Sequence, residues 1–176
     1  MTDRTCTVLT GLPAAGKSTR VASLLFGYGA VDRPFVYSTD NLIDEWAADD
    51  GKTYNEVFND LISLATNTMD RLLEDAIHSG RDIIWDQTNT GAKKRLKIIR
   101  RMKNAGYRVE CECIQPPFSD DEVNEWLTRL NSRPGKTIPD HVMSSMMENY
   151  TIPTVDEGFD AVHIFDMYGN LVSDAA

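Results

Sequence analysis

Long apolar runs are missing from this sequence. No stretch of its 176 residues approaches the roughly 20 apolar residues that a helix needs to cross a bilayer. Residues 1–4 also lack the basic region and apolar core of a secretory signal peptide. We therefore expect a cytoplasmic protein that makes no contact with membranes.

Cysteine is scarce, with three in the chain and neither a Cys-x-x-Cys pair nor a histidine close to them. The odd number argues against a disulfide framework, and the spacing argues against a zinc site. Cys6 falls in one predicted strand, and Cys111 and Cys113 alternate along another, so the latter two share a face. We expect all three to pack in the core.

Basic residues are in the minority, with 18 Lys and Arg against 27 Asp and Glu and a net charge of −9. This balance disfavours broad attraction to nucleic acids or anionic lipids, so a nucleic-acid contact would need a local basic patch. One such concentration comprises Lys93, Lys94, Arg95, Lys97, Arg100, Arg101 and Lys103. Two interpretations stay open: a solvated helix, or a patch for a polyanionic substrate.

Short β-rich runs alternate with amphipathic helical stretches over the whole length, which is typical of an α/β fold with a mainly parallel sheet. We predict one domain, 1–176, built as a three-layer sandwich around five strands. The predicted strands are 5–10, 35–38, 82–86, 107–114 and 160–165. The predicted helices are one ending near 26, then 40–48, 53–79, 91–105, 120–132 and 139–150.

The segment Gly11-Leu12-Pro13-Ala14-Ala15-Gly16-Lys17-Ser18 matches the complete phosphate-binding loop pattern. It follows a predicted strand and opens a helix, as this loop requires. Backbone N–H groups and the helix N-terminus would bind phosphate oxygens, Lys17 would reach the outer phosphates, and Ser18 would bind Mg²⁺. We assign these residues and the adjacent Thr19 to ATP, because the Asn-Lys-x-Asp motif that reads guanine is missing.

Two carboxylates follow predicted strands. Asp40 comes just after the second strand, where it could accept the proton of an attacking hydroxyl or merely cap the next helix. Asp86 ends the third strand and could hold Mg²⁺, orient Asp40, or cap the loop that follows. Ligands of open α/β sheets bind at the carboxyl ends of the strands. On position alone both interpretations of Asp40 stay open, and the convergence of three strand ends favours the functional interpretation of Asp86.

Arg129 and Arg133 stand four residues apart on one helix face, before Pro134-Gly135. Arginines on a short mobile lid, about residues 130–140, would stabilise phosphoryl charge once substrates are bound. The alternative is a pair of cations at a helix C-terminus, favoured by the helix dipole. Thr137 and Pro139 look like the capped start of the next helix.

Taken together, five segments resemble the kinase domain of polynucleotide kinases. They are 11–18, 38–40, 85–89, 129–139 and 153–159, which span nearly the whole chain. The resemblance implies that Asp40 is the general base and Asp86 a second essential carboxylate. It also implies that Lys17 and Ser18 contact phosphate and magnesium, and that Arg133 is the lid arginine.

Phage polynucleotide kinases carry an arginine three residues after the base, where this chain has Ile43. The sequence is also similar to small phage kinases that phosphorylate the hydroxymethyl group of 5-hydroxymethyluracil within DNA. That similarity implies a DNA acceptor and, for a phage-encoded chain, the host cytoplasm. The alternatives are a polynucleotide 5′-hydroxyl, a small molecule or nucleoside, or a nucleotide-driven binding module. No obligate protein partner is evident.

Overall fold

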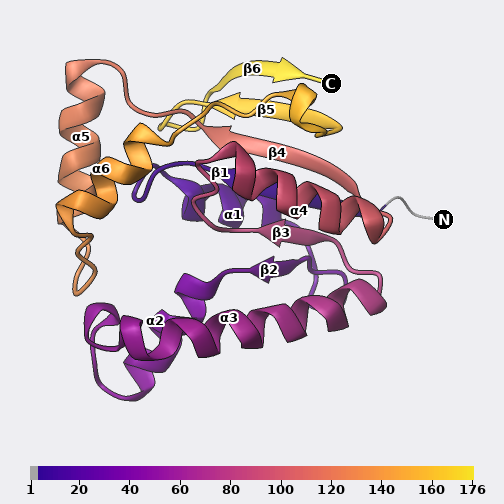
Figure 1. Cartoon of the computed structure of the whole chain (residues 1–176), viewed down its shortest axis with the longest axis horizontal. Coiled ribbons are helices and arrows are strands. Elements are labelled where there is room, and N and C mark those ends of the chain that lie inside the picture. Colours follow the sequence, from indigo (N-terminus) through magenta and orange to yellow (C-terminus); the bar gives the residue numbers. More distant parts are fainter. Residues whose placement is uncertain (1–3) are drawn as a thin grey trace.

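A six-stranded sheet forms the centre of the computed structural model, which describes residues 4–176 (Figure 1). Its order is β2-β3-β1-β4-β5-β6. The strands are β1 Thr5–Thr10, β2 Phe35–Tyr37, β3 Ile83–Trp85, β4 Arg108–Ile114, β5 Ala161–Phe165 and β6 Leu171–Ala175. The first five run parallel to one another, so the predicted α/β class with a mainly parallel sheet is confirmed.

Strand β6 was not predicted, so the expectation of five strands was wrong. It pairs antiparallel with β5 at the sheet edge, and all five of its residues are exposed. A strand with no buried face has no need of the apolar alternation from which strands are predicted. The pairing itself, backbone to backbone, leaves no trace in the side-chain pattern.

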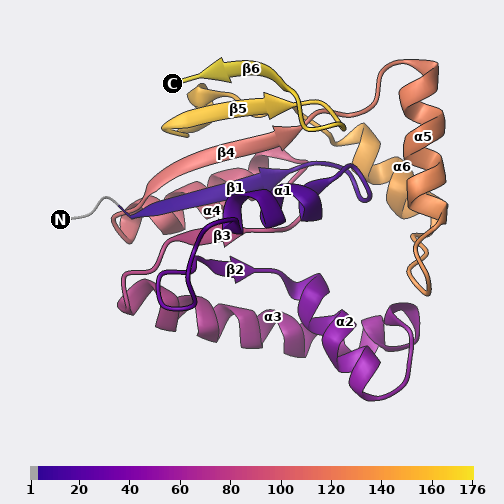
Figure 2. The ribbon, with the colours of Figure 1, turned by 180° about the vertical axis from the view of Figure 1, so that it is seen from behind.

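In the described part of the chain, six α-helices surround the sheet: α1 Lys17–Leu25, α2 Thr39–Asp49, α3 Tyr54–His78, α4 Ala92–Asn104, α5 Asp120–Asn131 and α6 Asp140–Glu148. Helices α3 and α4 cover one face and α1 covers the other (Figures 1 and 2). Helices α2, α5 and α6 stand beyond the carboxyl ends of the parallel strands (Figure 2). Within residues 4–176, no helix has both the length and the apolar character needed to cross a membrane.

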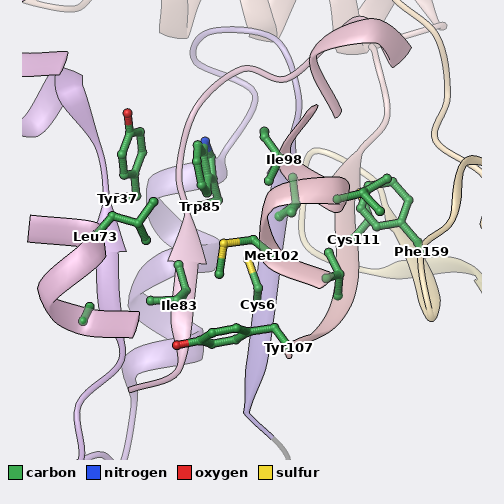
Figure 3. Packing of buried hydrophobic residues seen from close by; sticks show 14 of the residues in the cluster. Cys6, Tyr37, Leu73, Ile83, Trp85, Ile98, Met102, Tyr107, Cys111 and Phe159 are labelled. Atoms are coloured by element: carbon green, nitrogen blue, oxygen red, sulfur yellow. The ribbon is translucent and has the colours of Figure 1, made fainter. Parts of the chain in front are cut away.

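The core follows from alternation along the strands. Cys6 of β1 packs in one cluster with Leu73 of α3 and Met102 of α4 (Figure 3). The opposite face of β1 directs Leu9 toward Val21 of α1. All three cysteines are free thiols and fully buried, which confirms the prediction that they pack in the core.

The basic run from 93 to 103 is not uniformly solvated, because Arg95 is fully buried. Its Nε and Nη2 donate to the two Glu157 oxygens at 2.8 and 2.6 Å, and Nη1 donates to the carbonyls of Asn89 and Thr90 at 3.0 Å each. Nη2 also donates to Thr151 at 2.9 Å, so all five N–H donors are used. Arg95 thus joins the loop after β3 to the segment before β5.

We expect Arg95→Ala to lower the free energy of unfolding by about 3 kcal/mol, because it leaves the largely enclosed Glu157 carboxylate and the Asn89 carbonyl without their donor. Urea denaturation measures the change. The matched control is Arg100→Ala on the same helix, an exposed residue that should change stability by less than about 0.5 kcal/mol. Equal effects of the two substitutions would show that the buried pair does not stabilise this fold.

Candidate functional site

The glycine-rich loop between β1 and α1 is held in place by its neighbours. Trp126 of α5 donates an indole N–H to the Pro13 carbonyl at 2.8 Å, and the Gly11 N–H donates to the Thr88 carbonyl at 3.0 Å. A side chain at position 11 would approach the Ile114 carbonyl to 3.3 Å. Gly16 has φ 114°, which favours glycine, and it caps α1. The loop therefore presents its backbone toward the helix N-terminus, as anion binding requires.

Lys17 folds back over this loop and donates to the carbonyls of Gly11 and Leu12 at 2.9 and 2.8 Å. Burial lowers the pKa of Lys17 to about 8, against the opposing attraction of Asp86 and Asp40. The nearby charges of Arg133 and Lys136 lower it further. A partly desolvated ammonium bound only to carbonyls is suited to exchange them for phosphate oxygens.

One cavity of about 1520 Å³ brings most of the predicted site residues together. Its walls include Pro13, Ala14, Gly16, Lys17, Ser18, Thr19, Asp40, Asp86, Arg129 and Arg133. Three predicted residues are buried within the loop and do not line the cavity: Gly11, Leu12 and Ala15. The loop, both carboxylates and both arginines therefore face a single space.

Asp40 lies in the first turn of α2 and does not cap it. The cap is Ser38, whose hydroxyl accepts from the Asn41 N–H at 3.4 Å. The alternative interpretation of Asp40 as a helix cap is therefore wrong. The Asp40 carboxylate is exposed to the cavity and accepts a hydrogen bond of 2.9 Å from the Tyr54 hydroxyl.

Asp86 follows β3 and lies beside Lys17 and Asp40. Burial raises the pKa of the Asp86 carboxyl, Lys17 lowers it, the Asp40 charge raises it, and a hydrogen bond with Ser38 lowers it. Asp40 and Asp86 therefore lie close together, just beyond the carboxyl ends of the adjacent strands β2 and β3.

The two arginines of α5 and the lid differ in how they are held. Arg129 forms an ion pair with Glu125 and donates to the Met167 carbonyl at 3.1 Å. Arg133 has one long bond, from Nε to the Leu130 carbonyl at 3.4 Å, and burial lowers its pKa. Its Nη2 is buried without a hydrogen-bond partner among residues 4–176. A buried cationic donor with no acceptor is the clearest sign of an anion site.

The lid between α5 and α6 is docked on the start of α3. Asn55 exchanges two hydrogen bonds of 3.2 Å with the backbone of Thr137, and its N–H donates to the Gly135 carbonyl at 3.1 Å. The expectation that Thr137 caps the next helix was wrong: α6 begins at Asp140 with Pro139 in the cap position. The polar groups of Thr137 serve lid docking instead.

Three site residues were missed by sequence reasoning: Asp44, Tyr54 and Lys136. The Lys136 ammonium lies 2.8 Å from Asp44, 3.5 Å from Asp40 and 3.9 Å from the centre of the Tyr54 ring. Asp44 stands one helix turn after Asp40, so the two share a helix face. This spacing could have indicated Asp44 as a site residue. Tyr54 and Lys136 come from distant segments and gave no such signal.

Ile43, where phage polynucleotide kinases have an arginine, does not face the cavity. It is fully buried between α2 and α3 with Ala47, Val57 and Ala65. The isoleucine is therefore a core residue and does not line the cavity.

The residues that line the cavity are suited to bind a nucleoside triphosphate with Mg²⁺. The unpartnered Arg133 donor and the Lys17 ammonium suit phosphate oxygens, and the first turn of α1 contains no acidic residue that would repel them. Within 4–176, no cluster of three or more His, Cys, Asp or Glu could hold a metal ion. Mg²⁺ in phosphate sites typically takes one or two side chains besides phosphates and water. Ser18 and Asp86 would supply them.

Strand, glycine loop and helix together define a P-loop nucleotide-binding domain. A family model described as an AAA domain matches residues 7–153, and the chain belongs to this family.

Two solved structures share the fold. One comes from the PezAT chromosomal toxin–antitoxin system of the human pathogen Streptococcus pneumoniae: TM-score 0.66, 16% identity, covering 99% of this chain and 72% of that one. The other is a provisionally assigned kinase from Chloroflexus aurantiacus: TM-score 0.65, 17% identity, covering 93% and 88%. At these identities the likeness concerns the fold alone.

We expect the affinity for ATP to fall as the pH rises through about 8, the pKa of Lys17, because the triphosphate needs the charged ammonium. The loss should approach about tenfold per pH unit above that value. Fluorescent ATP-analogue titrations between pH 7 and 9.5 measure it. In Lys17→Arg the cation stays charged, so the affinity should vary little over this range. The same pH dependence in both proteins would contradict the assignment.

Proposed function

We propose that this chain is an ATP-dependent kinase that transfers the γ-phosphate to a hydroxyl group bound beside Asp40. The observation that carries the proposal is the shared cavity: phosphate loop, two carboxylates and an arginine with an unpartnered donor all face it. A module that only binds nucleotide needs no exposed carboxylate across from its phosphate site.

The residues divide the chemistry between them. The oxygen of the acceptor hydroxyl attacks the γ-phosphorus, and Asp40 accepts the proton of that hydroxyl. The bond between the γ-phosphorus and the β–γ bridging oxygen breaks, and ADP leaves. Lys17 and Arg133 bind the phosphate oxygens and stabilise their charge. Ser18 and Asp86 would hold Mg²⁺, which would neutralise phosphate charge. The docked lid limits access of water to the γ-phosphate.

The first candidate acceptor is DNA, with the hydroxymethyl group of 5-hydroxymethyluracil as the target. Besides the sequence resemblance, a row of cations on α4 supports it. Lys93, Lys97 and Arg100 are exposed, share a helix face, and make no ion pair within residues 4–176. Lys94, beside them, lines the cavity. These cations could bind the backbone phosphates of a DNA strand and place its bases near Asp40.

A second candidate is a small hydroxyl compound, which other residues that line the cavity favour. They include the carboxylates of Asp40 and Asp44, the amide of Asn59 and the ring of Phe58. Carboxylates and amides beside an aromatic face suit a neutral polyhydroxy compound or a nucleoside better than a polyanion.

A labelled-ATP panel separates these acceptors. It contains oligonucleotides with free 5′-hydroxyls, 5′-blocked oligonucleotides with 5-hydroxymethyluracil, and nucleosides and sugars. We expect label on the blocked modified oligonucleotide, and a several-fold higher KM for it in the double variant Lys97→Glu, Arg100→Glu, because the phosphate contacts are lost. Label only on small compounds would establish the second candidate, and label on none would refute the kinase.

We expect Asp40→Asn to lower kcat about 10²–10⁴-fold, because the amide cannot accept the hydroxyl proton. Binding of ATP, measured by titration, should change little, since Asp40 lies on the acceptor side. The matched control is Asp49→Asn, on the same helix but outside the cavity, which should keep kcat. Full activity of the Asp40 variant would exclude it as the base.

A further inference from the structure

We propose that Lys136 is a positioning residue for the general base: it couples closure of the lid to the placement of Asp40, with Asp44 as its anchor. This inference rests on the proposed function and adds to it a residue that neither the loop pattern nor the lid arginines indicate. The evidence is the set of contacts that converge on one ammonium group.

The Lys136 side chain is more enclosed than the two carboxylates that it contacts. Its side chain is 17% exposed, against 48% for Asp44 and 56% for Asp40. It forms the short ion pair with Asp44 at 2.8 Å, the longer one with Asp40 at 3.5 Å, and lies over the Tyr54 ring at 3.9 Å. A lysine that contacts two carboxylates and an aromatic face is fixed in one place. It is more than a solvated lid cation.

The contacts hold Asp40 from two sides. Tyr54 donates to Oδ1 at 2.9 Å, and Lys136 faces Oδ2 at 3.5 Å. Since each carboxylate oxygen has two lone pairs, both contacts leave a position free to accept the acceptor proton. The carboxylate is therefore oriented without being blocked. Asp44 takes the shorter ion pair, which keeps the lysine from binding Asp40 too closely.

Lys136 also lies between the two points at which the lid is docked, the Gly135 carbonyl and the Thr137 backbone, both bonded to Asn55. The same segment carries Arg133 and its unpartnered Nη2 into the cavity wall. Closure of the lid thus brings Arg133 to the phosphates and Lys136 to the base. With the lid open, both cations would leave the site together.

A latch that merely stabilises the closed lid predicts a different result from a positioning residue. Loss of a latch would weaken ATP binding, because Arg133 would leave the phosphates. Loss of a positioning residue would lower kcat with little change in ATP affinity, because misplacing a reacting group by about 1 Å can cost on the order of 100-fold in rate.

The test uses Lys136→Met, Lys136→Arg, Asp44→Asn and the double variant Lys136→Met, Asp44→Asn, with Lys52→Met as the matched control. Lys52 is exposed, with one long ion pair of 3.8 Å to Asp50, and does not line the cavity. For each protein, kcat and KM for the acceptor identified on the panel, the Kd for ATP and the melting temperature are measured.

We expect Lys136→Met to lower kcat about 10–100-fold, with a change in ATP Kd below about threefold and little change in melting temperature. Lys136→Arg should recover most of the rate, since a cation remains. Asp44→Asn should lower kcat less, and the double variant should be no slower than Lys136→Met, because the two residues act through one contact.

Three results would overturn the inference: unchanged kcat in Lys136→Met, a loss of kcat matched by an equal loss of ATP affinity, or additive effects of the two single substitutions. These are distinguishable from failure of the proposed function. In that case the unaltered protein, although it binds ATP, would transfer phosphate to no hydroxyl on the panel, and both proposals would fall.

Discussion

The buried guanidinium of Arg95 determines where the phosphate loop lies. It fixes the carbonyls of Asn89 and Thr90. Asn89, held at φ 46°, in turn donates its amide to the Leu9 carbonyl at 2.7 Å, and the preceding Thr88 carbonyl accepts from Gly11. A chain of hydrogen bonds therefore runs from α4 through the loop after β3 to the end of β1. Glu157, in the segment before β5, balances the charge of the buried guanidinium.

Charge in the cavity is arranged around this frame. Lys17 and Arg133, whose pKa values burial lowers, line the cavity together with the exposed carboxylate of Asp40. Asp86 lies between them and interacts with both Lys17 and Asp40. Removing such groups from water costs free energy, and a bound triphosphate would offset that cost by supplying the missing acceptors. Without a bound triphosphate, the charged groups of the site are therefore unpaired or only weakly paired.

The parts of the site that could be predicted from sequence are those with a local pattern. The loop from Gly11 to Ser18 is contiguous in sequence. Asp40 and Asp86 each follow a recognisable strand, and parallel strands end at one edge of the sheet. That edge was sufficient to predict that these residues lie together. Tyr54 and Lys136 meet only through tertiary folding, and no periodicity relates residues so far apart. A buried Arg95 within a basic run looks like its exposed neighbours until its partner Glu157 is found.

The way the lid docks has a thermodynamic consequence. Its contacts with α2 and α3 include amide hydrogen bonds, ion pairs and a cation–aromatic contact. Salt screens partly exposed ion pairs. The equilibrium between open and closed lids should therefore depend on ionic strength, and a higher salt concentration would shorten the time for which the cavity stays closed.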